Sequence, residues 1–229
     1  MAVSSEKKQG HALEVPPISI ESAASQEAKY YFFFKRMIDV TFSLMGMLLL
    51  LPLFLVIYIL IKAEDMHGSV LFKQQRVGKN GELFYMYKFR SMVSNAEALK
   101  EALLQQNEAT GPVFKIKYDP RVTKVGRVIR RMSIDELPQL INVLRGEMSL
   151  VGPRPALPDE VEQYTEYEKQ RIQVTPGLTC YWQVSGRSNI RFDEWIALDL
   201  KYIEQKSLWV DFKLIFKTVF VLFGSKDAY

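Results

Sequence analysis

An uncharged apolar segment at residues 40–61 constrains this chain more than any other feature. The segment is rich in Leu, Ile, Val and Phe, and it reaches the length of about 20 residues that an α-helix needs to cross a bilayer. A helix buried in a soluble core is the less favoured alternative, because the segment is apolar on all its sides. The sequence therefore predicts a membrane anchor.

The flanks of this segment predict how it sits in the membrane. Basic residues crowd both sides, at Lys29, Lys35, Arg36, Lys62, Lys73, Arg76 and Lys79. Positive charge is retained on the cytoplasmic side, so both ends are expected there. Pro52 removes one backbone hydrogen bond in mid-segment and can kink the helix. These features favour a re-entrant helix–break–helix that enters one leaflet and returns; a simple crossing is the alternative, because spanning helices tolerate proline.

The length and composition of the chain, with the patterns along it, predict a helix-rich α+β protein with three parts. We expect a disordered tail at 1–28, the re-entrant anchor at 29–65 and a small cytoplasmic catalytic domain at 66–229, with a short β-hairpin and interfacial helices. A net charge of +4 argues against a generally basic nucleic-acid binder. One cysteine precludes an internal disulfide, and two histidines argue against zinc. A metal would be an oxygen-liganded ion such as Mg²⁺.

Short patterns predict the elements of that domain. Asn80-Gly81 is a strong hairpin-turn signal between a strand candidate at 69–72 and a return strand at 83–89. Thr123 is suited to cap a short basic helix. Further helices are expected at 94–108, 159–173, 192–205 and 208–223, with a strand at 181–187. The last helix either lies at the membrane interface or packs inside the domain.

The stretch Ser133-Ile134-Asp135-Glu136-Leu137-Pro138 places two adjacent carboxylates at a helix start. Ser133 and Glu136 have the spacing of a capping box, although Pro138 also allows the helix to begin later and leave the acids on the preceding turn. Upstream lies a basic run of Lys115, Lys117, Arg121, Lys124, Arg127, Arg130 and Arg131, with the single acid Asp119. Cations beside a nucleophilic carboxylate suit phosphate chemistry; an ordinary capped helix after a solvated basic helix is the alternative.

Other residues are candidates for ligand binding. Lys88 and Arg90 share one face of the predicted return strand, where they either contact phosphate or protect a sheet edge. Arg154 lies between two prolines, whose fixed backbone suits a guanidinium that forks a phosphate; a surface arginine on a connector is the alternative. Gln183 and Arg187 are suited to read a polar ligand such as a nucleotide.

In this order, the motifs resemble the bacterial sugar transferases, which are monotopic polyprenyl-phosphate sugar-1-phosphate transferases. The resemblance covers the chain from about residue 31 onward, and several ordered motifs are far more specific than any one alone. The motifs are Lys35-Arg36, the Pro-broken apolar segment, Lys88-Phe89-Arg90-Ser91-Met92, the stretch from Ser133 to Leu140, Ser149-Leu150-Val151-Gly152-Pro153-Arg154-Pro155, and Pro176-Gly177-Leu178-Thr179 with Gln183-Val184-Ser185-Gly186-Arg187. Two positions depart from the family pattern: Cys180 replaces the usual glycine, and Leu51 replaces the small polar residue that often precedes the membrane proline.

The resemblance implies an enzyme that uses Mg²⁺ to transfer a hexose 1-phosphate, nearest to galactose or glucose, from a UDP-sugar to undecaprenyl phosphate, with release of UMP. Asp135 matches the family's nucleophile, which carries a covalent phospho-sugar intermediate. Glu136 matches its acidic partner in Mg²⁺ binding or proton handling. The expected substrate contacts are Lys88, Arg90, Arg130, Arg131 and Arg154, with Gln183 and Arg187 on the nucleotide side.

The implied setting is the cytoplasmic face of the bacterial inner membrane, at the first membrane step of exopolysaccharide, capsule or O-antigen assembly. Downstream glycosyltransferases and a second copy of the chain are candidate partners, and nucleic acid is not expected. The alternative from another class is a membrane-tethered, non-catalytic module that binds anions or nucleic acid.

Overall fold

The structure is a computed structural model that describes residues 26–114, 116–185 and 190–224. The predicted tail therefore lies outside the described residues, except that its last three residues belong to the first helix. The predicted fold class, α+β and rich in helix with a small β-hairpin, is confirmed.

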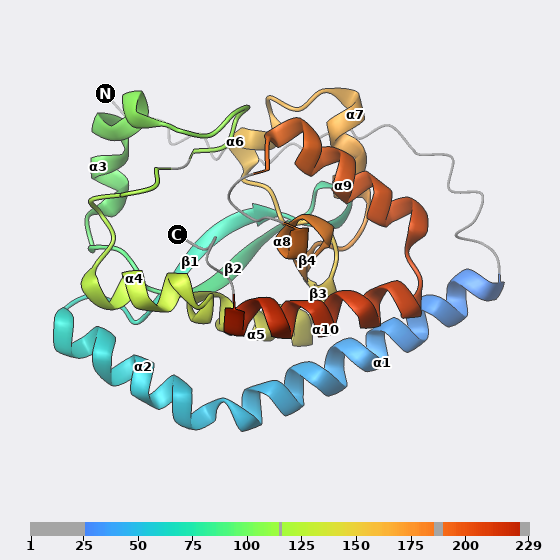
Figure 1. Ribbon diagram of the computed structural model, residues 1–229, viewed down its shortest axis with the longest axis horizontal. Helices are drawn as coiled ribbons and strands as arrows, with labels where there is room; N and C mark the ends of the chain where they lie inside the picture. Colours follow the sequence, from blue (N-terminus) through green and yellow to red (C-terminus); the bar gives the residue numbers. More distant parts are fainter. Residues whose placement is uncertain (1–25, 115, 186–189, 225–229) are drawn as a thin grey trace, which may run out of the picture.

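Two apolar helices, α1 (Gln26–Leu49) and α2 (Leu51–Glu64), form a bent pair along the lower edge of Figure 1. The bend is 60°. Pro52 lies in the first turn of α2, where a missing amide is tolerated, but it cannot continue the hydrogen-bond series of α1. The predicted break at this proline is confirmed. No single described helix has the length and apolarity of a membrane span, and the two helices reach those values only as a pair.

Charged side chains fasten the first half of α1 to the rest of the chain. The ammonium of Lys35 pairs with Asp211 at 2.8 Å. The guanidinium of Arg36 donates to the carbonyls of Val143 and Leu144 at 2.6 and 2.7 Å, at the last turn of α5 (Leu140–Arg145). A cation at the carboxyl end of a helix satisfies orphan carbonyls and complements the helix dipole. These basic flanks of the apolar segment are therefore anchors within the fold.

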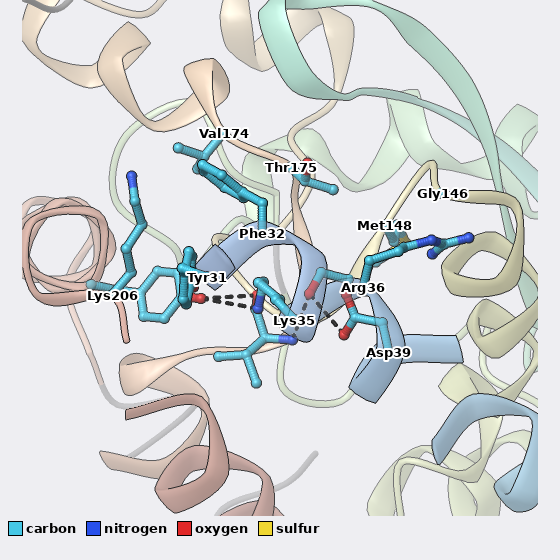
Figure 2. Close-up of a pocket in the computed structure, with 13 residues that line it drawn as sticks. Tyr31, Phe32, Lys35, Arg36, Asp39, Gly146, Met148, Val174, Thr175 and Lys206 are labelled. Carbon is cyan, nitrogen blue, oxygen red and sulfur yellow. Dashed lines mark hydrogen bonds between the residues drawn. The ribbon is translucent and has the colours of Figure 1, made fainter. Parts of the chain in front are cut away.

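A cavity of about 140 Å³ lies beside this attachment (Figure 2). Tyr31 and Phe32 of α1 line one part of it together with Lys206, whose ammonium lies 5.9 Å from the centre of the Phe32 ring. Deeper in, Asp39 accepts hydrogen bonds from the hydroxyl of Ser149 and the amide of Leu150, at 3.0 and 2.9 Å. The buried carboxylate of Asp39 is thus paired with the chain that follows, which helps to fix the direction of the helix.

The end of α2 is fastened at the opposite side of the domain. Ile57 and Ile61 are buried against Ile129, which belongs to α4 (Lys124–Arg131). The carboxylate of Glu64 accepts from the amides of Lys124 and Val125 at 2.7 and 3.1 Å, so it caps the amino end of α4. Thr123 accepts from the amide of Gly126 at 2.9 Å, which confirms its predicted role as a cap.

Two small sheets form the centre of the domain. The antiparallel hairpin consists of β1 (Leu71–Val77) and β2 (Leu83–Phe89). Asn80 and Gly81 adopt positive φ values of 55° and 84°, which confirms the predicted turn; β1 starts later and ends later than predicted. The second sheet pairs β3 (Ser149–Val151) with β4 (Gly177–Thr179) in parallel.

Several helices surround these sheets, and two local predictions are wrong. The predicted helix at 159–173 is divided into α6 (Pro158–Val161), α7 (Glu166–Lys169) and the 3-10 turn η4 (Gln170–Gln173). The predicted strand at 181–187 is a helix over its described part, α8 (Tyr181–Ser185), since a five-residue pattern does not distinguish the two periods. The helix predicted at 94–108 is shorter, α3 (Ala96–Leu103).

The last two helices agree with their predicted positions. They are α9 (Phe192–Gln205) and α10 (Leu208–Gly224). In Figure 1, α10 runs alongside α1. Asp211 and Leu214 of α10 are buried, whereas Trp209, Phe212, Phe216 and Phe220 are exposed. The helix therefore packs on the domain with one face and presents an aromatic face outward.

Candidate active site

The two candidate catalytic acids lie on η3 (Ile134–Gln139), a short 3-10 helix that leads directly into α5. The predicted capping box is wrong: Ser133 has φ 54° and ψ 21°, and its side chain forms no cap hydrogen bond. Pro138 lies inside η3 and has no amide to support a regular first α-turn. The alternative, with both acids on the turn before the α-helix, is the arrangement observed. The left-handed backbone conformation of Ser133 costs about 1 kcal/mol or more, so contacts with the surrounding fold must hold this turn in place.

Asp135 and Glu136 lie against the hairpin. The ammonium of Lys88 on β2 donates to a carboxylate oxygen of Glu136 at 2.6 Å. Asp135 is only 8% exposed, whereas the side chain of Glu136 is 39% exposed. The sequence predicted Lys88 as a phosphate contact and not as a partner of the two acids; the structure places its ammonium against Glu136.

The two carboxyl groups have opposite electrostatic environments. Burial raises the pKa of Asp135 to about 6, with Lys88 opposing the shift and Glu136 adding to it. Burial also raises the pKa of Glu136, but the positive charges of Lys88 and then of Arg154 and Arg76 outweigh it and leave that pKa below its usual value. Glu136 is therefore the permanent anion of the pair, and Asp135 is the carboxyl that exchanges its proton near neutral pH.

Three arginines contribute positive charge around this pair. Arg130 of α4 lowers the pKa of Asp135, and Arg154 lowers that of Glu136. Arg76 of β1 acts on Glu136 as well, although the sequence marked it only as a basic flank of the apolar segment. The register pairs Arg76 with Phe84 and Phe72 with Lys88, so period two puts Arg76 and Lys88 on one face of the hairpin. Arg76 was not assigned to the site from the sequence alone, because the sequence did not reveal this pairing register.

The other predicted contacts are placed differently. Arg90 follows the end of β2, and its guanidinium donates to the carboxylate of Asp65 at 2.6 Å, at the end of α2. Arg131 is exposed on the last turn of α4, and Gln183 is half-buried on α8. Arg187 lies outside the described residues. The cavity of Figure 2 has neither Asp135 nor Glu136 in its lining, so it is separate from this site.

The donor set bears on the metal that the sequence predicts. Within the described chain, no group of three or more His, Cys, Asp or Glu residues could hold an ion by itself. Mg²⁺ commonly takes one or two carboxylates and completes its shell with water and substrate phosphates. The second carboxylate oxygen of Glu136 fits that role, because Lys88 occupies only the first.

This arrangement is suited to chemistry at phosphorus. A buried carboxylate is held beside a fixed anion and at least three cations, which is an environment that stabilises charge on a phosphoryl group. The described charges thus favour an anionic ligand with a reactive centre near Asp135.

Comparisons with known proteins agree with this reading. The chain is 48% identical over 191 residues to a protein from Streptococcus agalactiae named galactosyl transferase CpsE, and 44% identical over 201 residues to one from Salmonella typhimurium named undecaprenyl-phosphate galactose phosphotransferase. These alignments cover 82% and 86% of the chain, which spans only 42% of the length of either relative. It is 39% identical to the exopolysaccharide production protein ExoY of Sinorhizobium fredii, with 85% of this chain and 88% of that protein aligned. A family model described as bacterial sugar transferase matches residues 30–225, and the chain therefore belongs to the bacterial sugar transferase family.

Proposed function

We propose that this protein transfers a hexose 1-phosphate, galactose or glucose, from a UDP-sugar to undecaprenyl phosphate and releases UMP. The family, and the undecaprenyl-phosphate galactose phosphotransferase name of the Salmonella relative, support the reaction class and the lipid acceptor. The reaction would be the first membrane step of exopolysaccharide, capsule or O-antigen assembly.

The proposed reaction has two steps at one phosphorus atom. A carboxylate oxygen of Asp135 attacks the phosphorus that bears the sugar, the bond from that phosphorus to the bridging oxygen breaks, and UMP leaves with that oxygen. An oxygen of undecaprenyl phosphate then attacks the same phosphorus, which restores the free carboxylate of Asp135 and forms the diphosphate-linked sugar. Two successive displacements let one phosphate-binding site serve both polyanions in turn.

The surroundings of Asp135 are the observation that carries this proposal. Its carboxyl is buried, its pKa is raised to about 6, and the ionised Glu136 beside it is paired with Lys88 at 2.6 Å. A desolvated carboxylate with an elevated pKa is a stronger nucleophile than an exposed one and is still mostly ionised at neutral pH. Arg130 and Arg154 are placed to offset charge on the phosphoryl group.

Glu136 would hold Mg²⁺ together with oxygens of the substrate phosphates. When bound, the ion offsets the charge that develops on the leaving phosphate. Lys88 keeps Glu136 ionised and oriented in either case.

The bent helix pair supports a re-entrant position in the cytoplasmic leaflet of the inner membrane. The start of α1 is tied to the domain by Lys35 and Arg36, and the end of α2 is tied to it by Glu64. With these attachments kept, both ends of the pair would lie on the same side of a membrane that its apolar elbow enters. The exposed aromatic face of α10 would lie at the same interface.

Exchange of labelled UMP into the UDP-sugar tests the proposal, because this exchange needs only the first step. We expect the wild-type enzyme to catalyse exchange without lipid acceptor, and Asp135→Asn to abolish it. Mass spectrometry of protein incubated with UDP-galactose alone should show a sugar-phosphate adduct on Asp135. Near wild-type exchange by Asp135→Asn would refute the nucleophile, and Mg²⁺-independent binding of anions without turnover by the wild type would favour a non-catalytic module.

A further inference from the structure

The short loop that carries Arg154 has all of its carbonyl groups engaged. From residue 153 to residue 156, the four consecutive carbonyls accept hydrogen bonds of 2.8, 2.9, 3.1 and 2.9 Å. The donors are, in order, the amide of Gly177, the guanidinium of Arg171, the guanidinium of Arg76 and the amide of Val77. Two of the four residues are prolines, whose φ angles are fixed. The backbone of Arg154 is thus held at successive points by groups far away in the sequence.

Arg171 is the donor to the carbonyl of Arg154 itself. Its side chain is 1% exposed and pairs with Asp199, which is fully buried, at 2.6 Å. A second donor of the same guanidinium reaches the hydroxyl of Tyr164 at 2.8 Å. The guanidinium carbons of Arg171 and Arg154 lie 5.0 and 5.4 Å from the centre of the Trp195 ring. Arg171 therefore sets both the backbone of Arg154 and the aromatic surface on which its side chain rests.

Arg76 holds the next carbonyl, that of Pro155, at 3.1 Å. It is 4% exposed and forms no ion pair with any residue in the described ranges; its other hydrogen bond is to the side chain of Gln74 at 2.7 Å. Burial of a guanidinium without a carboxylate in contact with it is costly, so a purely structural role at this position would not require an arginine. The charge of Arg76 also acts on Glu136.

The side chain of Arg154 is left available by this arrangement. Among the described residues it has no hydrogen-bond or ion-pair partner, and its contact is with the Trp195 ring. A guanidinium on a fixed backbone, with five N–H donors and no acceptor within the described ranges, is suited to an external anion.

We propose that Arg76 and Arg171 form a brace, here meaning these two buried arginines, that positions Arg154 for the substrate phosphate. This inference rests on the proposed function, because it assumes that Arg154 contacts the phosphate. The two arginines are positioning residues: they act through the carbonyls of residues 154 and 155 and not through contact with the substrate.

A double-mutant cycle with Arg154→Ala tests the brace. The brace variants are Arg76→Met and, so that no buried carboxylate is left unpaired, Arg171→Met with Asp199→Leu. We expect Arg154→Ala to lower kcat/KM for UDP-galactose about 100-fold, and each brace variant to lower it about 10-fold with most of the loss in kcat. In the Arg154→Ala background, Arg171→Met with Asp199→Leu should cost less than about 2-fold, because its target is gone. Arg76→Met should cost clearly less than about 10-fold there, since only the action of its charge on Glu136 remains.

Arg121→Met with Asp119→Leu is the matched control, since it too leaves no buried carboxylate unpaired. Arg121 is also buried and paired, with Asp119 at 2.7 Å, but none of its hydrogen bonds goes to the Arg154 loop. Its effect should be the same in both backgrounds. A purely structural brace would lower the melting temperature and the folded fraction but leave kcat/KM per folded enzyme unchanged, and this result would overturn the proposal. Losses that multiply with Arg154→Ala would overturn it too, since they would mean independent action.

The dissociation constant for UDP, measured by calorimetry on the same proteins, separates this inference from the proposed function. A wild type that binds UDP without turnover would refute the transferase, and the brace would then be judged by the same cycle in binding. If the wild-type protein neither turned over UDP-galactose nor bound UDP, the proposed contact of Arg154 with phosphate would be refuted, and the proposed brace with it.

Discussion

Asp135 and Glu136 are adjacent in sequence, yet the fold gives their carboxyl groups different properties. Asp135 lies under the protein surface, so desolvation dominates and its pKa rises to about 6. Burial also raises the pKa of Glu136, but Lys88 in contact with it and the charges of Arg154 and Arg76 together outweigh burial, so that pKa falls. A pair of acids whose pKa values are driven apart is a common way to assign different chemical roles to two identical groups.

Asp135→Asn should stabilise the protein while it inactivates it. A folded-state pKa raised from 3.8 to about 6 means that the acid contributes its stability below pH 4 and loses it as the pH rises through 6. Removing the charge should therefore raise the free energy of unfolding above pH 6 by about 1–3 kcal/mol, with no gain near pH 4. Denaturant unfolding in detergent across this range measures it, with the exposed acid Asp159→Asn as control. A loss of stability at pH 8 would contradict the electrostatic account.

Lys88→Met should raise the pKa of Glu136, because it removes the largest opposing cation from a carboxyl that burial already disfavours as an anion. We expect at least about a 100-fold loss of kcat/KM and an acidic limb of the pH–rate profile that moves to higher pH. Lys88→Arg should retain part of the activity, because it keeps the charge. A profile unchanged in shape for Lys88→Met would exclude this role.

Residues that belong to short sequence motifs were the predictable part of the site. Asp135, Glu136 and Lys88 belong to recognisable motifs, and the structure places them together. Arg76 escaped prediction because its position depends on the register of the hairpin, which no local pattern reveals. Arg90 was predicted as a second phosphate contact, and that role stays a prediction. The structure shows that β2 ends at Phe89 and that the guanidinium of Arg90 donates to the carboxylate of Asp65, at the end of α2.

At the scale of elements, the second sheet explains why two separated motifs belong together. Gly152 and Gly177 lie side by side where β3 and β4 pair, and the loop with Arg154 starts there. A Cβ atom on Gly177 would lie 2.0 Å from the amide nitrogen of Gly152 and 2.5 Å from its Cα. The two strands can approach this closely only because neither residue has a side chain.

Gly177→Ala should therefore destabilise the fold by about 1–3 kcal/mol or more and reduce kcat/KM in the fraction that folds, because the mount of Arg154 shifts. Gly46→Ala is a suitable control. Gly46 lies inside α1, where alanine favours the helix, and its added Cβ would lie at an ordinary 3.5 Å from the side chain of Leu140 in α5. We expect the control to be neutral or slightly stabilising. Equal melting temperatures for the two variants would show that the close approach of the strands does not determine the stability of the fold.

Element prediction succeeded in part, because a long period alone was not sufficient: the predicted helix at 159–173 is divided into α6, α7 and η4. The helix at 192–205 was predicted at its observed bounds, and Asn80-Gly81 fixed the hairpin turn. It failed at 133–136 and 181–185, where four or five residues matched a pattern that the tertiary structure overrode. Pro138 decided the first case, since a regular helix needs the amide that proline lacks.

At the scale of the whole molecule, the bent pair of α1 and α2 is bound to the domain at both ends. Lys35 and Arg36 were read as charges that keep the flanks cytoplasmic, and the structure adds that they bond to Asp211 and to carbonyls of α5. Between the two attachments, the elbow exposes Leu48, Leu49, Leu51 and Leu55, each with at least 58% of its surface accessible. An exposed apolar elbow of this size suits hydrocarbon and not water.

A transmembrane crossing would require one of these attachments to break. With the domain on one side, the start of α1 on the other would leave Lys35, Arg36 and the buried Asp39 without their partners, at a cost of several kcal/mol for each unpaired charge. A re-entrant pair keeps all of them. We therefore expect single cysteines at Gln9 and at Gln75 to be shielded from a membrane-impermeant thiol reagent in intact cells and labelled after permeabilisation, with the buried Cys180 as the unlabelled background. Labelling at Gln9 alone in intact cells would establish a crossing, and would mean that the contacts of α1 with the domain do not persist in the membrane.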